Sequence, residues 1–179
     1  MAAELTLEVL DALLSPTQNA KAEEYYQSIP LVHRMSSLVQ LLPNLLQDPN
    51  QNGYVAQSML ACVLLRRNIQ SLGGMIACND PVEGVESVQK VVEICKHVVD
   101  TVLALWSALE TSNSTMKPIR RQMAFVVAEI VSTLLLTEEN SSVAVVNLVL
   151  EKIAPAVSSD RLMSVSTRIV MDLTYVFYF

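Results

Sequence analysis

The chain has 179 residues, of which 51% are hydrophobic and 17% charged, and its net charge at pH 7 is −6. This apolar composition excludes an intrinsically disordered chain, and the length is sufficient for one domain with its own core. The acidic balance argues against a nucleic-acid partner, because phosphates require a basic surface, but it allows a basic protein partner.

Charged and amide residues interrupt every hydrophobic segment, so no run of about 18–20 apolar residues exists and no membrane contact is expected. The first residues include Glu4, Glu8 and Asp11 and no basic residue, unlike a secretory signal or a transit peptide. Three widely spaced cysteines, two of them (Cys62 and Cys95) on apolar helical faces, indicate buried free thiols in a reducing compartment. We therefore expect a cytosolic or nuclear protein.

Apolar residues recur at intervals of three or four almost throughout, which predicts an all-α protein. Proline, glycine and Asn-Ser breaks divide the chain into eight expected helices. These helices span residues 3–14, 17–28, 31–46, 54–72, 82–110, 118–136, 142–156 and 160–179.

The longest expected helix, 82–110, has the clearest periodicity. Asp80 is a candidate N-cap and Pro81 suits the first helical position, so both mark its start. Its apolar stripe predicts a face buried in the core. The stripe consists of Val85, Val88, Val92, Cys95, Val99, Val102, Trp106 and Leu109.

Consecutive helices pair as 3–28, 31–72, 82–136 and 142–179 within a single array over residues 1–179. The centres of the second helices are separated by roughly 38, 63 and 41 residues, and two of these intervals fit HEAT or armadillo units. The sequence therefore predicts an α-α superhelix, a HEAT/armadillo-like solenoid of about four pairs. Because the chain stops at Phe179 without a polar cap, we expect it to be a fragment of a longer array.

The residue sets that catalysis requires are missing from the sequence. His33 has no cysteine or carboxylate at ligand spacing, and His97 lies on the polar flank of the 82–110 helix, where Cys95 points to a different face. Both histidines are therefore expected at the surface. No Gly-rich phosphate loop, nucleophile elbow or pair of carboxylates in an apolar stripe occurs. Met59 and Met123 lie on core stripes and are expected to pack rather than to bind. The sequence thus predicts a protein that is not an enzyme and has no metal or cofactor.

Three segments, taken in order, resemble the amino-terminal HEAT repeats of the importin-beta (karyopherin-beta) superfamily. They are LLSPTQNAKAEEYYQSIP at 13–30, AQSMLACVLLRRNIQSL at 56–72 and MKPIRRQMAFVVAEIVSTLL at 116–135. The segment at 56–72 is most similar to the receptor type that imports ribosomal proteins and histones. The segment 73–115 is longer than the connection typical of the family, and the last pair has no convincing match.

The resemblance implies a superhelical solenoid whose second helices line a concave surface. In this family the first repeats bind the small GTPase Ran in its GTP form, which expels cargo in the nucleus. Basic cargo proteins would be bound by repeats beyond this chain. Carried over by position, the candidate partner-binding residues are Glu23, Glu24, Gln57, Arg66, Arg67, Lys117, Arg120, Arg121 and Glu129.

Each of these residues also has a structural interpretation. Arg66 and Arg67 fall near the expected end of the 54–72 helix before Gly73, where the helix dipole favours cations. The dipole disfavours Arg120 and Arg121 at the start of a helix, so these arginines are expected to pair with partner carboxylates or with neighbouring acidic repeats.

Two other functions fit the same pattern. One is a HEAT or armadillo scaffold of another cytosolic assembly, such as a phosphatase regulatory subunit or a microtubule-associated array, which would bind partners through its loops. The other is an α-helical enzyme completed by a second chain, which a cofactor or metal bound to the purified protein would reveal.

Overall fold

The computed structural model describes residues 4–47, 53–78, 80–82, 85, 87–109, 116–135, 147 and 151. These residues form helices and connecting turns without a strand among them, which confirms the all-α prediction. The expected helices 142–156 and 160–179 lie outside the described residues, apart from helical Asn147 and Glu151. The helices are α1 Leu7–Leu14, α2 Asn19–Ser28, α3 Leu31–Gln47, α4 Tyr54–Cys78, α5 Val88–Ala108 and α6 Lys117–Leu135.

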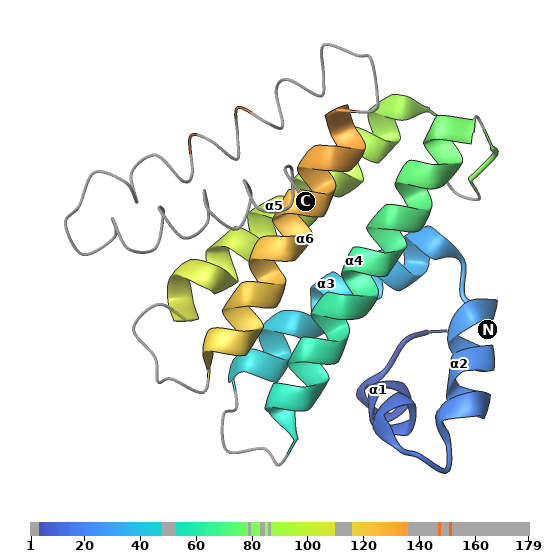
Figure 1. Cartoon of the computed structure of the whole chain (residues 1–179), viewed down its shortest axis with the longest axis vertical. Coiled ribbons are helices and arrows are strands. Elements are labelled where there is room, and N and C mark those ends of the chain that lie inside the picture. Colours follow the sequence, from blue (N-terminus) through green and yellow to red (C-terminus); the bar gives the residue numbers. More distant parts are fainter. Residues whose placement is uncertain are drawn as a thin grey trace.

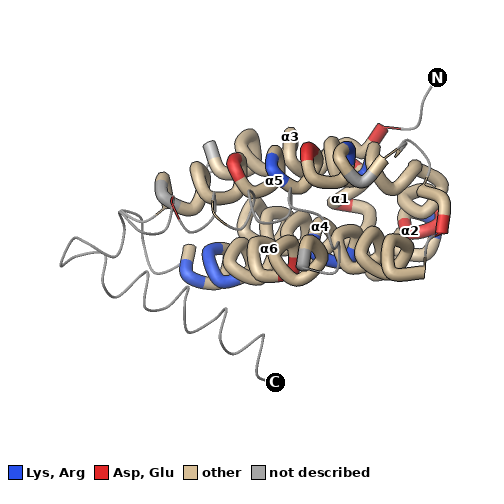
Figure 2. The backbone as a smooth tube through the Cα atoms, turned by 90° about the horizontal axis from the view of Figure 1, so that it is seen from above, with Lys and Arg blue, Asp and Glu red and all other residues tan. Residues whose placement is uncertain are grey.

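The helices pack in two layers (Figures 1 and 2). α4 and α6 lie side by side in one layer, and α3 and α5 lie in the other. Within each pair α3 packs on α4 and α5 on α6, while α1 packs against both α2 and α4. In the second and third pairs the first helices α3 and α5 contact each other, and the second helices α4 and α6 contact each other, as in a helical-repeat superhelix. This arrangement confirms the predicted fold class.

One continuous hydrophobic cluster runs through these layers from Leu5 to Leu134. The stripe predicted for α5 is part of it, and its residues from Val92 to Leu109 are buried. Met123 is also buried, and Met59 is half-buried against the cluster. His33 and His97 are exposed, as expected from their surroundings in the sequence.

α4 extends to Cys78 through both glycines, so the predicted end at residue 72 is wrong. Gly73 is buried against α6, and a Cβ atom built on it would lie 3.0 Å from Oγ1 of Thr133. The missing side chain thus permits close packing of the two helices and does not end α4. Arg66 and Arg67 consequently lie in mid-helix, which removes the helix dipole as the reason for their position.

α5 begins at Val88, six residues later than predicted at residue 82. The Ser87 hydroxyl accepts a hydrogen bond from the Lys90 amide at 3.3 Å, which is the contact of an N-cap residue. Asp80 and Pro81 precede the helix without regular structure, so they do not cap it. Local capping by Ser87 therefore sets the start of α5.

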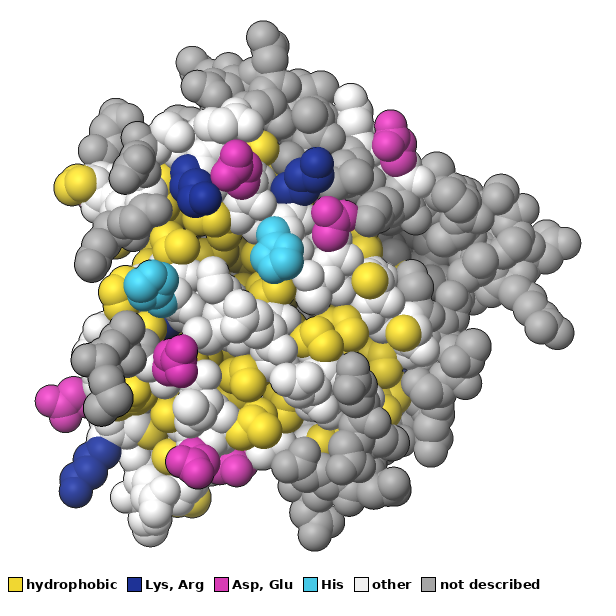
Figure 3. Space-filling view, turned by 180° about the vertical axis from the view of Figure 1, so that it is seen from behind, with side chains coloured by type: hydrophobic (Ala, Val, Ile, Leu, Met, Phe, Trp, Pro, Cys, Tyr) yellow, Lys and Arg dark blue, Asp and Glu magenta, His cyan; other side chains and the backbone are white. Residues whose placement is uncertain are grey.

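The face formed by α3 and α5 is seen in Figure 3, where hydrophobic side chains are interspersed with charged and histidine side chains. A shallow groove of about 210 Å³ lies between the two helices and is lined in part by Val39, Ile94 and His97.

No helix in the described part of the chain has the length and hydropathy needed to span a membrane.

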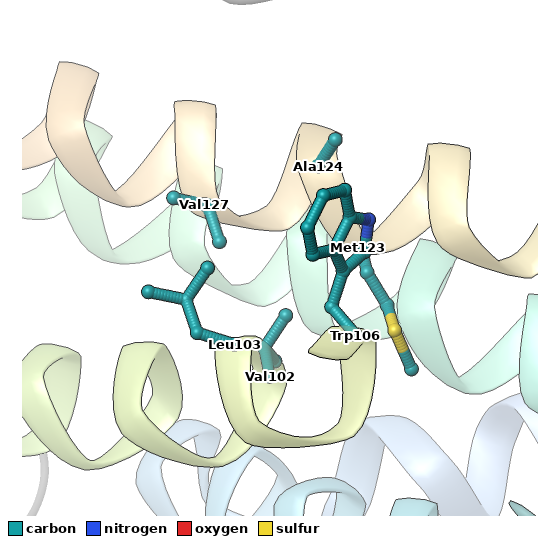
Figure 4. Close-up of a pocket in the computed structure, with 6 residues that line it drawn as sticks. All are labelled: Val102, Leu103, Trp106, Met123, Ala124 and Val127. Carbon is teal, nitrogen blue, oxygen red and sulfur yellow. The ribbon is translucent and has the colours of Figure 1, made fainter. Parts of the chain in front are cut away.

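A small apolar cavity of about 10 Å³ lies between α5 and α6 (Figure 4). Trp106 and Leu103 of α5 face Met123, Ala124 and Val127 of α6 across it. A space of this size holds about one water molecule, and its lining provides no polar partner for one. The cavity is therefore a packing defect in the core.

Candidate partner-binding surface

The second helices α2, α4 and α6 carry all nine residues expected to bind a partner. α4 packs directly along α6. α2 adjoins α4, because the amide of Asn68 donates a buried 2.8 Å hydrogen bond to the Tyr26 hydroxyl. Residues from three sequence-distant segments are thus carried by neighbouring helices.

Arg66 and Glu129 pair with each other across the seam between α4 and α6. Nε of Arg66 lies 3.2 Å from Oε2 of Glu129, and the Gln70 amide donates to the same oxygen at 2.8 Å. The Arg66 guanidinium also lies 5.3 Å from the ring centroid of Phe125. Because the side chain of Glu129 is only 17% exposed, this carboxylate mainly links two repeats.

The start of α6 is basic, as Figure 2 shows. The Arg120 guanidinium lies 5.0 Å from the ring centroid of Trp106, and Nε of Arg120 is buried without a hydrogen-bond partner among the described residues. Arg121 is exposed and lies 5.5 Å from the ring centroid of Phe125, while Lys117 is exposed. Cation–π contacts thus offset the unfavourable dipole at this helix start.

The remaining candidates of the first two pairs differ in exposure. Gln57 is 2% exposed and donates to the Asp11 carboxylate, so its side chain joins α4 to α1 and does not face solvent. Glu23 is half-buried and accepts a 2.8 Å hydrogen bond from Gln27, whereas Glu24 and Arg67 are exposed. Arg67, Glu24, Lys117 and Arg121 are therefore the candidates most open to a partner.

A polar groove of about 460 Å³ opens where α2, α3 and α4 meet. The residues that line the groove are Glu23, Tyr26, Gln27, Arg34, Leu64, Arg67, Asn68, Gln70 and Ser71. The sequence indicated Glu23 and Arg67 as binding residues. It missed Arg34, because Arg34 belongs to a first helix and only second helices were expected to bind a partner. Burial raises the pKa of Tyr26, and the hydrogen bond from Asn68 and the charge of Arg34 partly oppose this shift. The phenol therefore stays neutral and acts as a fixed polar group.

The described residues contain no cluster of three or more His, Cys, Asp or Glu side chains that could hold a metal ion. Cys62 and Cys95 are buried free thiols, as predicted, while Cys78 is exposed at the end of α4.

Comparison with known protein families, with curated proteins and with solved structures finds no match for this chain.

Proposed function

We propose that this chain is the protein-binding, amino-terminal portion of a nuclear import receptor that binds GTP-loaded Ran and acts in the cytoplasm and the nucleus. The observation that carries the proposal is the lateral packing of α4 on α6, with α2 adjoining α4. The three segments that resemble importin repeats largely coincide with these helices. Polar residues far apart in the sequence thereby become available to one partner.

The charges on these helices favour an acidic patch on that partner. The chain as a whole is acidic, with a net charge of −6. Arg67, Lys117 and Arg121 are nevertheless exposed on α4 and α6, and no ion pair engages them within the described residues. Complementary charges at the rim of an interface mainly accelerate association and select the partner.

A pull-down of the 179-residue chain with Ran loaded with GTP or GDP tests the proposal. We expect the GTP form to be retained preferentially. Charge reversal by Arg67→Glu together with Arg121→Glu should weaken retention about thirtyfold or more, because each reversal replaces an attraction by a repulsion and costs about 1 kcal/mol or more. Circular dichroism should show unchanged helicity, since both side chains are exposed.

The control is Lys96→Glu, which changes the charge in the same direction, by −2 compared with −4 for the double variant, on an exposed residue of α5. Its retention of Ran should match that of the unaltered chain. Equal retention of the GTP and GDP forms would contradict Ran recognition. An equal loss with Lys96→Glu would show that net charge, and not the second helices, governs binding.

A further inference from the structure

The groove between α2, α3 and α4 has the composition of a binding site. Its volume of about 460 Å³ accommodates several side chains, and Leu64 is the only aliphatic side chain among the described residues that line it. Tyr26 and Asn68 form a buried hydrogen bond at its base, so this wall is already ordered. An ordered polar groove lowers the cost of fixing a ligand.

Arg34 on α3 is held in place on one side of the groove. Its guanidinium lies 5.0 Å from the ring centroid of Tyr26, and Nη1 donates a 2.8 Å hydrogen bond to the side-chain oxygen of Gln27. Nε of Arg34 is buried without a hydrogen-bond partner among the described residues, so a ligand would be bound by the outer N–H groups of the guanidinium that Gln27 does not use. A planar guanidinium fixed in this way recognises carboxylates well.

Arg67 on α4 also lines the groove, and its side chain is exposed. Its guanidinium forms no hydrogen bond or ion pair within the described part of the chain. Glu23 is the one carboxylate among the described residues that line the groove. Two arginines and one glutamate leave a charge of +1 in the groove (2 − 1), although the whole chain carries −6.

We propose that this groove binds one carboxylate side chain, from an acidic segment of a partner protein, between Arg34 and Arg67. A single carboxylate neutralises the charge of +1. A phosphate, with a charge of about −2 at neutral pH, would leave an excess negative charge beside Glu23. Gln70 and Ser71 donate to Glu129 and to the Arg67 carbonyl, and their side-chain oxygens remain as acceptors for the partner backbone. The inference rests on the protein-binding role proposed above, but it does not require the partner to be Ran.

Fluorescence anisotropy of the full chain with a labelled glutamate-rich heptapeptide, Gly-Glu-Glu-Gly-Glu-Glu-Gly, tests this site. The comparison peptide carries glutamine in place of every glutamate. At low salt, where exposed charges are weakly screened, we expect the glutamate peptide to bind about tenfold more tightly, because charge-assisted hydrogen bonds are the stronger ones.

The variants locate the binding in the groove. Arg67→Gln and Arg34→Gln should each lower the affinity for the glutamate peptide about fivefold or more. Lys96→Gln on α5 removes the same charge outside the groove and should change it less than about twofold. Arg67 is exposed, so its variant stays folded even if loss of the Arg34 contacts destabilises the chain.

Three results would overturn the site. They are equal binding of the two peptides, an equal loss of affinity with Lys96→Gln, and tighter binding of a phosphoserine peptide than of the glutamate peptide.

The experiments distinguish failure of the proposed receptor function from failure of the proposed groove. Arg67-dependent peptide binding without retention of GTP-loaded Ran would reject the receptor assignment and support the groove, and the reverse pattern would reject the groove alone.

Discussion

The thiols of Cys62 and Cys95 lie in the core, where ionisation is costly. Burial raises the pKa of each from 9.0 to about 12. Desolvation is the single cause in both cases, since no charged neighbour contributes. Both groups therefore stay neutral in the folded chain at a pH where the unfolded chain has already lost these protons.

These shifts predict that the chain loses stability in alkali. Above about pH 9 the unfolded state binds fewer protons than the folded state, so the free energy of unfolding falls as the pH rises. The stabilising effect is fully present below pH 9.0, the pKa of an unperturbed thiol, and is lost up to about pH 12. Each thiol should account for a loss of about 1 kcal/mol between neutral pH and about pH 10.

Urea unfolding under reducing conditions at several pH values measures this loss. The variant Cys62→Ala/Cys95→Ala should be less stable at neutral pH but should show a flatter dependence between about pH 9 and pH 10. Measurements stop there, because Tyr26, whose pKa is also raised above 10.0, adds to the loss at higher pH. The same slope in both proteins would show that other groups cause the loss.

At the scale of the helix, the adjacent glycines of α4 have opposite roles. Gly73 faces Thr133 of α6, whose side chain is buried, while Gly74 has no heavy atom within 4 Å of an added Cβ. A glycine in a helix is about 1 kcal/mol less favourable than alanine. This cost is offset by close helix packing at Gly73 and is not offset at Gly74.

The two alanine variants should therefore differ in stability. Gly74→Ala should raise the free energy of unfolding by about 0.5–1 kcal/mol. Gly73→Ala should be less stable than Gly74→Ala by about 1–3 kcal/mol, because its Cβ crowds Thr133. Thermal and urea unfolding of both variants measure the difference. If the two variants were equally stable, the close approach of α4 and α6 at Gly73 would be wrong.

Helix existence was predictable because an amphipathic period is a local property of the sequence. The bounds of α2, α3 and α6 differ from the predicted ones by no more than two residues. The predicted start at residue 3 was also wrong, because residues 4–6 precede α1, which begins at Leu7. The end of α4 and the start of α5 were wrong for different reasons. Packing on α6 retains Gly73 inside a helix, and the N-cap at Ser87 starts α5 later than Asp80 suggested.

At the scale of the molecule, α1 to α6 share one hydrophobic cluster from Leu5 to Leu134. Stacked repeats interact with their neighbours, so a short array with a continuous core unfolds cooperatively. Trp106, the only tryptophan in the chain, lies at the contact of α5 with α6. Its fluorescence therefore reports on the packing of the third predicted pair.

We expect urea unfolding followed by Trp106 fluorescence and by far-ultraviolet circular dichroism to give coincident transitions. Both signals depend on the same core, so the pair α5 and α6 should not unfold separately from the other helices. Met123→Ala, which enlarges the cavity beside Trp106, should lower stability by about 2–5 kcal/mol and keep the two transitions coincident. A fluorescence transition that precedes the loss of helicity would instead indicate independent unfolding of α5 and α6.

The candidate surface was only partly visible in the sequence. Positional resemblance indicated Arg67, Lys117 and Arg121, which are exposed on α4 and α6. It also indicated Gln57, which is buried, and Glu129, which is linked to Arg66 and Gln70. A helical period shows which residues share a face, but it does not tell which neighbour covers that face.

The sequence by itself determined that this protein is all-helical, that two of its thiols are buried and that its apolar stripes form a core, because each follows from local spacing and composition. Only the tertiary structure decided that Gly73 is a contact point, that Arg66 pairs with Glu129 and that Arg34 joins Arg67 around one groove. These relations connect residues about 30 to 60 positions apart, and they arise from the relative placement of helices, which depends on side-chain packing.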